Sequence, residues 1–309
     1  MNLQQLEYIL AVNEHRHFAR AAEACFVTQP TLSMMIQKLE DELGIKIFDR
    51  SRQPVCPTDA GLRLIEQAKR VLQQVERLQE MAHEERDYVG GELRVGIIPT
   101  IAPYLLPLFI EAFHAKYPMV KLRISELVTE NILHKLESGE LDAGILVPPE
   151  TDRKLTEIPL YTEAFVVYSP REFDKEYLLA EDINANASEL LLLEEGHCFR
   201  SQIMQFCELR KQMDNAVEYT SGSLETLRNL ADRHLGITIL PELATLNFSM
   251  EQLKKTKQFA APRPVRKVSL MMSRGYVKRK LIDLLAEEIK NQLPEELVTD
   301  EEQVVPFRG

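Results

Sequence analysis

The beginning of the chain repeats apolar positions with the spacing of short helices. Residues 2–14 place apolar side chains every three or four positions, and residues 18–24 carry alanines small enough for close helix packing. Thr28 predicts the start of a third helix, because its hydroxyl can cap free backbone N–H groups, and Gly44 predicts its end. The inward positions of this helix are Leu32, Ile36, Leu39 and Leu43. Two short helices, a tight turn and a capped helix form a helix-turn-helix pattern.

The next stretch predicts a wing and then a long helix. Residues 45–55 are interpreted as two short strands whose tip presents Arg50 and Arg52, and Thr58 can cap the helix that follows. One face of that helix carries an apolar stripe at Leu64, Ile65, Ala68, Leu72, Val75, Leu78 and Met81. Because one helix cannot bury such a stripe alone, the stripe indicates an interface, the alternative being packing onto its own domain. Residues 87–91 break the pattern and predict a hinge.

From Glu92 onward, strands alternate with helices. Buried apolar runs predict strands at 93–98, 120–124 and 141–147, with helices at 103–117 and 129–138. A second unit of the same kind begins near residue 164, and residues 268–272 return the chain to the first unit before a helix at 277–292. This alternation predicts an α/β fold with a parallel sheet in two subdomains, resembling periplasmic binding proteins with a cleft between their halves. The polar and acidic residues after Leu293 predict a loose tail.

The pattern thus divides the chain of 309 residues into three parts. We expect a winged helix-turn-helix domain at 1–58, a linker helix with its hinge at 59–90, and an α/β domain at 91–309. Within the last, one subdomain comprises 91–163 and 268–309 and the other comprises 164–267.

Composition and charge narrow the possible functions. The residues are 45% hydrophobic and 28% charged, which is typical of a folded core. No basic leader opens the chain and no apolar run approaches about 18 residues, so we expect a cytoplasmic protein without a membrane contact. Four dispersed cysteines fit neither a disulfide scaffold nor a zinc site, and no metal or other cofactor is expected. The net charge of −11 argues against indiscriminate nucleic-acid binding by the whole molecule, but it does not exclude a small DNA-binding module.

The strongest candidate chemistry lies in the stretch LLLLEEGHCFRSQIMQFCELR. Cys198 stands between two potential cations, His197 and Arg200, and a nearby cation lowers a cysteine pKa and favours the reactive thiolate. If residues 201–209 are helical, Cys198 and Cys207 lie about 13 Å apart, whereas a disulfide needs Cα atoms within about 7 Å. Oxidation to a disulfide then requires the segment to unwind, which is the behaviour of a switch. The alternative is that both cysteines are small buried hydrophobes in a reducing compartment.

The N-terminal stretch FARAAEACFVTQPTLSMMIQKLEDELGIKIFDR resembles the winged helix-turn-helix of LysR-type transcriptional regulators. The resemblance implies that the third helix enters the major groove of double-stranded operator DNA, and that the long helix is the dimerisation helix. The residues that it assigns to the DNA-facing start of the third helix are Gln29, Pro30, Thr31 and Ser33. Lys38, Arg50 and Arg52 add positive charge to that face. Met34 and Met35 stand where many members carry polar or basic residues.

The rest of the chain is similar to the peroxide-sensing members of the same family. The motifs that carry this similarity are IPT and APYLLP within 98–107, LESGELD at 136–142, GHCFRSQIMQFC at 196–207 and SLETLRNL at 223–230. The resemblance implies that Cys198 is the peroxidatic cysteine, oxidised to a sulfenic acid, and that Cys207 resolves it into a reversible disulfide. It places Thr100, Thr129, His197, Arg200 and Arg266 around the thiol. Ser201 replaces an acidic residue of those members.

The same resemblance implies a regulator that activates oxidative-stress genes and is not an enzyme. Its expected partners are promoter DNA, a second copy in a homodimer that assembles into a homotetramer, hydrogen peroxide, cellular thiol reductants and RNA polymerase. Two alternatives stay open. A LysR-type regulator gated by a small metabolite in the cleft would not need the cysteines. A thiol peroxidase would use the same oxidation chemistry but would turn peroxide over continuously.

Overall fold

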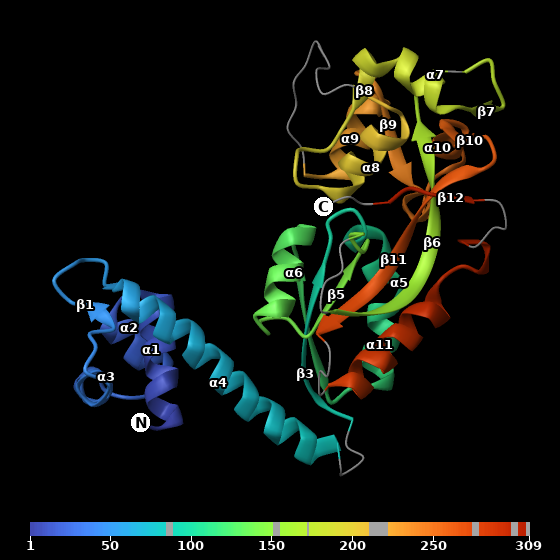
Figure 1. Cartoon of the computed structure of the whole chain (residues 1–309). Coiled ribbons are helices and arrows are strands. Elements are labelled where there is room, and N and C mark those ends of the chain that lie inside the picture. The colour runs from blue at the N-terminus through green and yellow to red at the C-terminus, as the bar shows by residue number, and fades with distance from the viewer. Residues whose placement is uncertain are drawn as a thin grey trace. The chain divides into compact units, whose positions relative to one another are not determined.

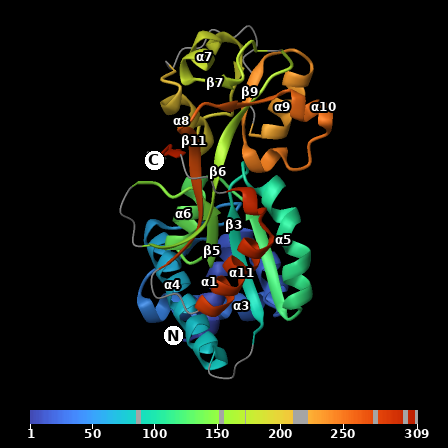
Figure 2. The same ribbon diagram turned by 90° about the vertical axis from the view of Figure 1, so that its right-hand side faces the viewer.

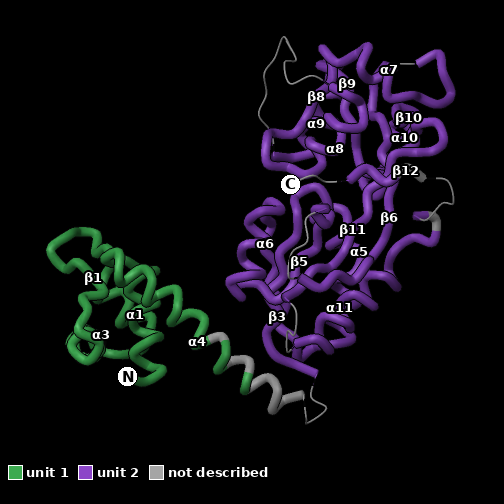
Figure 3. The backbone as a smooth tube through the Cα atoms, viewed as in Figure 1, with its two compact units in different colours: residues 1–88 green, residues 89–309 purple. Residues whose placement is uncertain are grey.

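The computed structural model describes residues 1–84, 89–150, 155–171, 173–209, 222–273, 278–297 and 302–306. The chain forms two compact units, residues 1–88 and residues 89–309 (Figure 3). The first unit is helical with a two-stranded wing, and the second is built on a ten-stranded sheet. Among the described helices, none is long and apolar enough to cross a membrane.

Three helices form the core of the first unit: α1 (Leu3–His15), α2 (Phe18–Ala24) and α3 (Gln29–Leu43). The hydroxyl of Thr28 caps α3 by accepting a hydrogen bond from the N–H of Thr31 at 3.4 Å. Gly44 ends the helix with φ of 66°, a left-handed conformation that glycine adopts without a steric penalty. The start and end of this helix predicted from the sequence are therefore confirmed.

A wing of two antiparallel strands follows, β1 (Phe48–Asp49) and β2 (Cys56–Pro57). Glu40, which is buried in α3, holds its base. Oε1 of Glu40 accepts hydrogen bonds from the N–H of Ile47 at 2.7 Å and of Phe48 at 3.2 Å. Its Oε2 accepts one from Arg50 at 3.3 Å. The carboxylate is stable away from water because these hydrogen-bond donors take the place of water molecules.

Helix α4 (Asp59–Glu84) carries the apolar stripe. Ile65 and Ala68 are buried against the core of the first unit, as in the alternative interpretation of the stripe. Leu78, further along, is 67% exposed, so the described residues of its own unit leave this part of the stripe largely uncovered. The side chain of Met81 and the hinge positions 87 and 88 lie outside the described residues.

One sheet runs through the whole second unit in the order β4-β3-β5-β11-β6-β10-β7, with β12 on β11, and with β9 on β6 and β8 (Figures 1 and 2). Its strands are β3 (Gly91–Ile97), β4 (Val120–Glu126), β5 (Ala143–Leu146), β6 (Leu155–Tyr168), β7 (Tyr177–Leu178), β8 (Leu190–Leu191), β9 (Ile237–Pro241), β10 (Thr256–Phe259), β11 (Arg263–Ser273) and β12 (Glu302–Val304). The long strands β6 and β11 pair antiparallel and extend from one half to the other. The sheet is therefore mixed rather than parallel, because the chain crosses between halves as extended strands instead of through helices.

Two hydrophobic cores divide this unit into halves that we call subdomains I and II. Subdomain I contains α5 (Ala102–Lys116), α6 (Thr129–Glu137), α11 (Arg279–Gln292) and η3 (Glu295–Leu297). Subdomain II contains α7 (Ala180–Ala185), η1 (Ala187–Glu189), α8 (Cys198–Phe206), α9 (Leu224–Asp232), η2 (Glu242–Thr245) and α10 (Met250–Lys254). Helix α6 lies close on the sheet because Gly144 has no side chain there: a Cβ would stand 2.4 Å from Ile132. This close packing fixes the position of Thr129 at the start of α6.

The prediction of a loose C-terminal tail is wrong for residues 302–306. Strand β12 pairs in parallel with the first residues of β11, and Val305 is buried in the core of subdomain II. The acidic residues 295–302 dominate the local composition, but two valines are sufficient to occupy an open sheet edge whose backbone groups need partners.

The buried carboxylate of Glu40 gives a test of the wing. Glu40→Ala leaves the N–H groups of Ile47 and Phe48 without acceptors, so we expect the first unit to lose about 3 kcal/mol of unfolding free energy. Hydrogen exchange of the α3 amides in the full chain measures this loss. Glu42→Ala is the control, because that carboxylate is half exposed and pairs with the terminal amino group, and it should change stability by less than about 1 kcal/mol. Equal protection in both variants would contradict the role of Glu40.

Candidate functional site at the start of helix α8

Cys198 is the first residue of α8 and is 2% exposed. Its side chain belongs to the core of subdomain I, whereas Phe199 and Ile203 on the same helix belong to the core of subdomain II. The thiol therefore lies where the two subdomains meet. The sequence predicted a helix from residue 201; the helix begins at Cys198, which places the thiol beside the free N–H groups of the first turn.

Arg266 is the cation of this site and is fully buried. It stands directly opposite Glu163 in the pairing of β11 with β6, and its Nε donates to Oε1 of Glu163 at 2.9 Å. Its other nitrogens donate to the hydroxyl and carbonyl oxygens of Thr100, at 2.9 Å and 3.0 Å. The guanidinium also lies 4.7 Å from the ring centre of Phe199, a cation–π contact. Arg266 thus ties both long strands to the loop after β3 and to α8.

Glu163 is a site residue that the sequence analysis missed. It is buried on β6, and its second oxygen accepts a hydrogen bond from the N–H of Leu243 at 3.0 Å. Burial raises the pKa of Glu163, while Arg266 and this N–H favour the ionised form. One signal was available: a charged residue interrupts the apolar strand LYTEAFVVY, and a buried charge needs a partner.

The surroundings of Cys198 act on its thiol in opposite directions. Burial raises the pKa of Cys198 above its ordinary value, while the charge of Arg266, the hydroxyl of Thr129 and the N–H groups at the start of α8 oppose the rise. Within the described residues, the buried Oγ of Thr129 has no partner that meets hydrogen-bond geometry, although it lies close enough to the sulfur to affect it. An unpaired hydroxyl beside a thiol is available to bind an oxygen atom of a small reactant.

His197 is not the cation expected from the sequence, and Arg200 is engaged by the backbone. His197 precedes α8 and is 6% exposed, and burial lowers the pKa of its imidazole although Glu194 lies 3.7 Å away. The neutral ring is therefore favoured. Arg200 donates to the carbonyl of Leu193 at 2.7 Å, in the segment before the helix. Arg266 is an expected basic residue whose charge favours the thiolate of Cys198.

Cys207 lies at the opposite end of α8, where it is the C-cap residue and 1% exposed. It belongs to the core of subdomain II, and burial raises its pKa to about 12. Both cysteines are free thiols. The nine-residue helix between them separates their Cα atoms by about 13 Å, as predicted, so a disulfide cannot form while α8 is intact.

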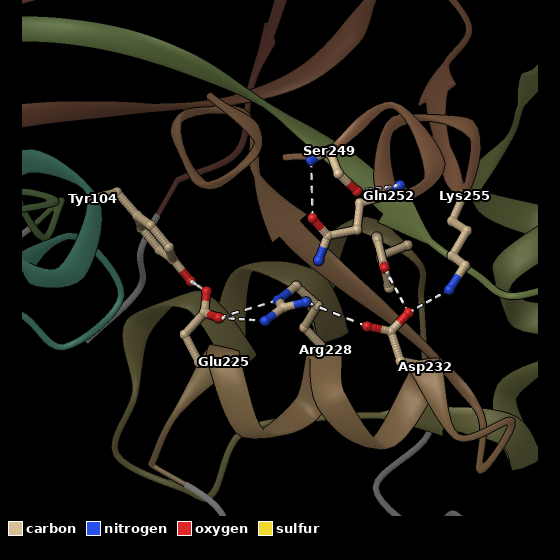
Figure 4. A network of polar contacts seen from close by, with 8 residues as sticks. Tyr104, Glu225, Arg228, Asp232, Ser249, Gln252 and Lys255 are labelled. Atoms are coloured by element: carbon tan, nitrogen blue, oxygen red, sulfur yellow. Dashed lines mark hydrogen bonds and ion pairs between the residues drawn. The ribbon is translucent and has the colours of Figure 1, made fainter. Parts of the chain in front are cut away.

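A polar network makes a second connection between the subdomains (Figure 4). The hydroxyl of Tyr104 on α5 donates to Glu225 on α9 at 3.0 Å. Glu225 accepts two hydrogen bonds from Arg228, which also donates to Asp232 at 3.3 Å. Lys255 donates to the other oxygen of Asp232 at 2.6 Å. Burial and Glu225 raise the pKa of the Tyr104 hydroxyl, which keeps it a proton donor in this contact.

The expected DNA-facing residues lie in the first unit. Gln29, Pro30, Thr31, Lys38, Arg50 and Arg52 are exposed, and Ser33 is half-buried. Arg50 is held in place: it donates to Ser33 at 3.2 Å and to Glu40, and its guanidinium lies 5.1 Å from the ring centre of Phe18. Arg52 pairs with Asp49 at 3.2 Å in the wing. The wing and the start of α3 are therefore joined through Arg50.

Both compact units of the chain match models of one bacterial family. Residues 3–62 match the regulatory helix-turn-helix protein of the LysR family, and residues 86–294 match the LysR substrate binding domain. The chain therefore belongs to the LysR family of bacterial transcriptional regulators, which bind DNA and are not enzymes.

Its relatives within that family include OxyR proteins. The hydrogen peroxide-inducible genes activator of Dickeya chrysanthemi is 38% identical, over 95% of this chain and 96% of the relative. The DNA-binding transcriptional dual regulator OxyR of Escherichia coli K12 has the same identity and coverage. The structure of a full-length OxyR variant from Pseudomonas aeruginosa is similar with a TM-score of 0.76 and 35% identity, covering 95% of this chain and 99% of that one.

Replacement of Arg266 tests the buried ion pair. Arg266→Met leaves the carboxylate of Glu163 buried without its counter-ion, so we expect urea unfolding of the reduced protein to show a loss of about 3–5 kcal/mol. Removing both charges with Glu163→Leu in the same chain should recover part of that loss. Lys267→Met, on the exposed neighbour, should leave stability nearly unchanged. If the double variant were less stable than Arg266→Met, the ion-pair explanation would be wrong.

The pKa of Cys198 predicts how its reaction with peroxide depends on pH. Because that pKa lies above its ordinary value of 9.0, the thiolate is the minor form at neutral pH. Its fraction, and with it the rate of sulfenic acid formation, should rise about tenfold per pH unit between roughly pH 6.5 and 8.5. Trapping the sulfenic acid in a Cys207→Ser chain that also lacks Cys25 and Cys56 measures this rate. A rate independent of pH would mean that Cys198 is already ionised.

Proposed function

We propose that this protein is a peroxide-sensing transcriptional regulator whose signal is a reversible disulfide between Cys198 and Cys207. One observation carries the proposal: two buried thiols stand at the two ends of one helix, and the charge of Arg266 and the unpaired hydroxyl of Thr129 act to lower the pKa of the first. The similarity to peroxide-inducible activators supports it. A structural role alone does not require a buried ion pair beside one of the cysteines.

The proposed chemistry has two balanced steps. The Cys198 thiolate attacks one oxygen of hydrogen peroxide, the O–O bond breaks, and the leaving hydroxide takes up a proton to become water. Thr129 is positioned to donate a hydrogen bond to the peroxide, and Arg266 to stabilise the developing negative charge. The sulfenic acid then condenses with the Cys207 thiol, which forms the S–S bond and releases a second water.

The separation of the thiols makes this reaction a conformational signal. Since the sulfurs meet only after α8 unwinds, the disulfide form has a different arrangement of the contacts that α8 makes in both cores. We propose that this change alters the packing of a homodimer and homotetramer joined in part through α4, and thereby the spacing of the DNA-reading helices. In the same proposal, the rearranged regulator contacts RNA polymerase and thereby activates oxidative-stress genes.

Reset of the signal requires a reductant. A disulfide that forces a helix to unwind is less stable than one formed in place, so we expect small cellular thiols to reduce it. We place the protein in the cytoplasm, where both its DNA and these thiols are found. Neither a metal nor another cofactor is required.

Peptide mass mapping of the purified full chain tests the chemistry. About one equivalent of peroxide should produce a Cys198–Cys207 disulfide within seconds, and dithiothreitol should remove it. Cys198→Ser should abolish the oxidation and the associated change in operator binding, whereas Cys25→Ser should leave both intact. An unmodified Cys198 after peroxide would overturn the proposal in favour of a metabolite-gated regulator.

A further inference from the structure

The C-terminal residues 302–306 lie against the helix that separates the two cysteines. β12 pairs with β11 up to Val265, the neighbour of Arg266. Val305 continues this pairing, because its N–H donates to the carbonyl of Val265 at 2.8 Å and its side chain is buried. Val304 and Val305 also line a cavity of 340 Å³ together with Phe206 and Cys207 at the end of α8. The tail is thus part of the surroundings of the second cysteine.

Gln202 connects α8 to this tail. Its side chain is fully buried, and its Nε2 donates to the carbonyl of Val305 at 2.6 Å. Since a carbonyl only accepts hydrogen bonds, this contact decides which end of the amide faces the tail. The other end, Oε1, is buried and has no partner within the described part of the chain. Among the described residues, the bond to Val305 is therefore the polar contact that holds this side chain inside the protein.

The capping groups of α8 contribute little to its stability. His197 makes no side-chain hydrogen bond as the N-cap. At the other end, Glu208 has φ of 50°, a left-handed conformation that is unfavourable for a residue with a side chain. The N–H of Leu209 donates to the carbonyl of Met204 at 3.0 Å and completes this turn. A helix with such caps depends on the contacts of its side chains, among them those of Gln202 in its middle turn.

We propose that Gln202 is a positioning residue that, through the C-terminal strand, holds α8 wound and thereby sets the reduction potential of the cysteine pair. This inference rests on the disulfide chemistry proposed above. Unwinding of α8 breaks the contact between Gln202 and Val305, so the contact stabilises the dithiol form and not the disulfide form. An interaction present in one form alone shifts the equilibrium toward that form, here toward reduction.

Redox titration of the full chain tests this role. The disulfide takes two electrons and two protons from dithiothreitol, which becomes its cyclic disulfide, and alkylation followed by mass measurement gives the reduced fraction. In a chain lacking Cys25 and Cys56, Gln202→Ala should lower the equilibrium constant for reduction about tenfold, which makes the potential about 30 mV more negative. Gln205→Ala is the matched control, because Gln205 is exposed on the same helix, and it should not change the potential.

A second variant separates the positioning role from a general loss of stability. Deletion of residues 302–309 should cause a similar shift, and adding Gln202→Ala to it should shift the potential little further, because both changes remove one shared contact. Fully additive shifts, or an unchanged potential in Gln202→Ala, would overturn the inference. If the deletion variant does not fold, the Gln202→Ala titration alone decides. A parent protein that forms no disulfide with peroxide would overturn the proposed function instead.

Discussion

The buried ion pair between Arg266 and Glu163 is the interaction on which the arrangement around the thiol depends. The two residues face each other on β11 and β6, the two strands that link the subdomains. Removing two charges from water costs free energy. Their mutual attraction offsets this cost only when further hydrogen bonds satisfy the remaining donors and acceptors of both groups. Arg266 donates a hydrogen bond to Thr100 and lies over the ring of Phe199, and Glu163 accepts a hydrogen bond from the N–H of Leu243. Strand register, the loop after β3 and the start of α8 are therefore fixed by the same charge that opposes the rise in the pKa of Cys198.

This arrangement also explains why the thiol rests protonated. Glu163 neutralises much of the charge of Arg266, and the apolar surroundings penalise a second anion, so burial dominates the pKa of Cys198. The thiolate therefore forms rarely, and a reactant must be small and polar to benefit from Arg266 and Thr129 at this depth. The low exposure of the Cys198 side chain also limits its reaction with larger oxidants. Selectivity then follows from access and geometry rather than from a permanently ionised cysteine.

The sequence was sufficient where a local pattern determines the structure. Thr28 and Gly44 bound α3 as their capping preferences predict, and the apolar runs at 93–98, 120–124 and 141–147 identified β3, β4 and β5. The sequence was insufficient where a structural feature depends on residues that are distant from each other along the chain. The distance between Glu163 and Arg266 along the chain hid their pairing, and the burial of His197, which removes its expected charge, arises only in the packed fold. Val304 belongs to the same class, because a valine in an acidic tail becomes part of a strand only when a sheet edge is available.

In the proposed switch, the assignment of the two cysteines to different cores is what lets α8 transmit a signal. Cys198 packs in the core of subdomain I and Cys207 in that of subdomain II, with the helix as the spacer between them. Any bond between the sulfurs must therefore remove at least one of them from its core. The end near Cys198 is held by the contact of Phe199 with Arg266, whereas the other end contains the unfavourable backbone of Glu208. The Cys207 end should consequently move first, so the change is directed into subdomain II and toward the C-terminal strand that packs there.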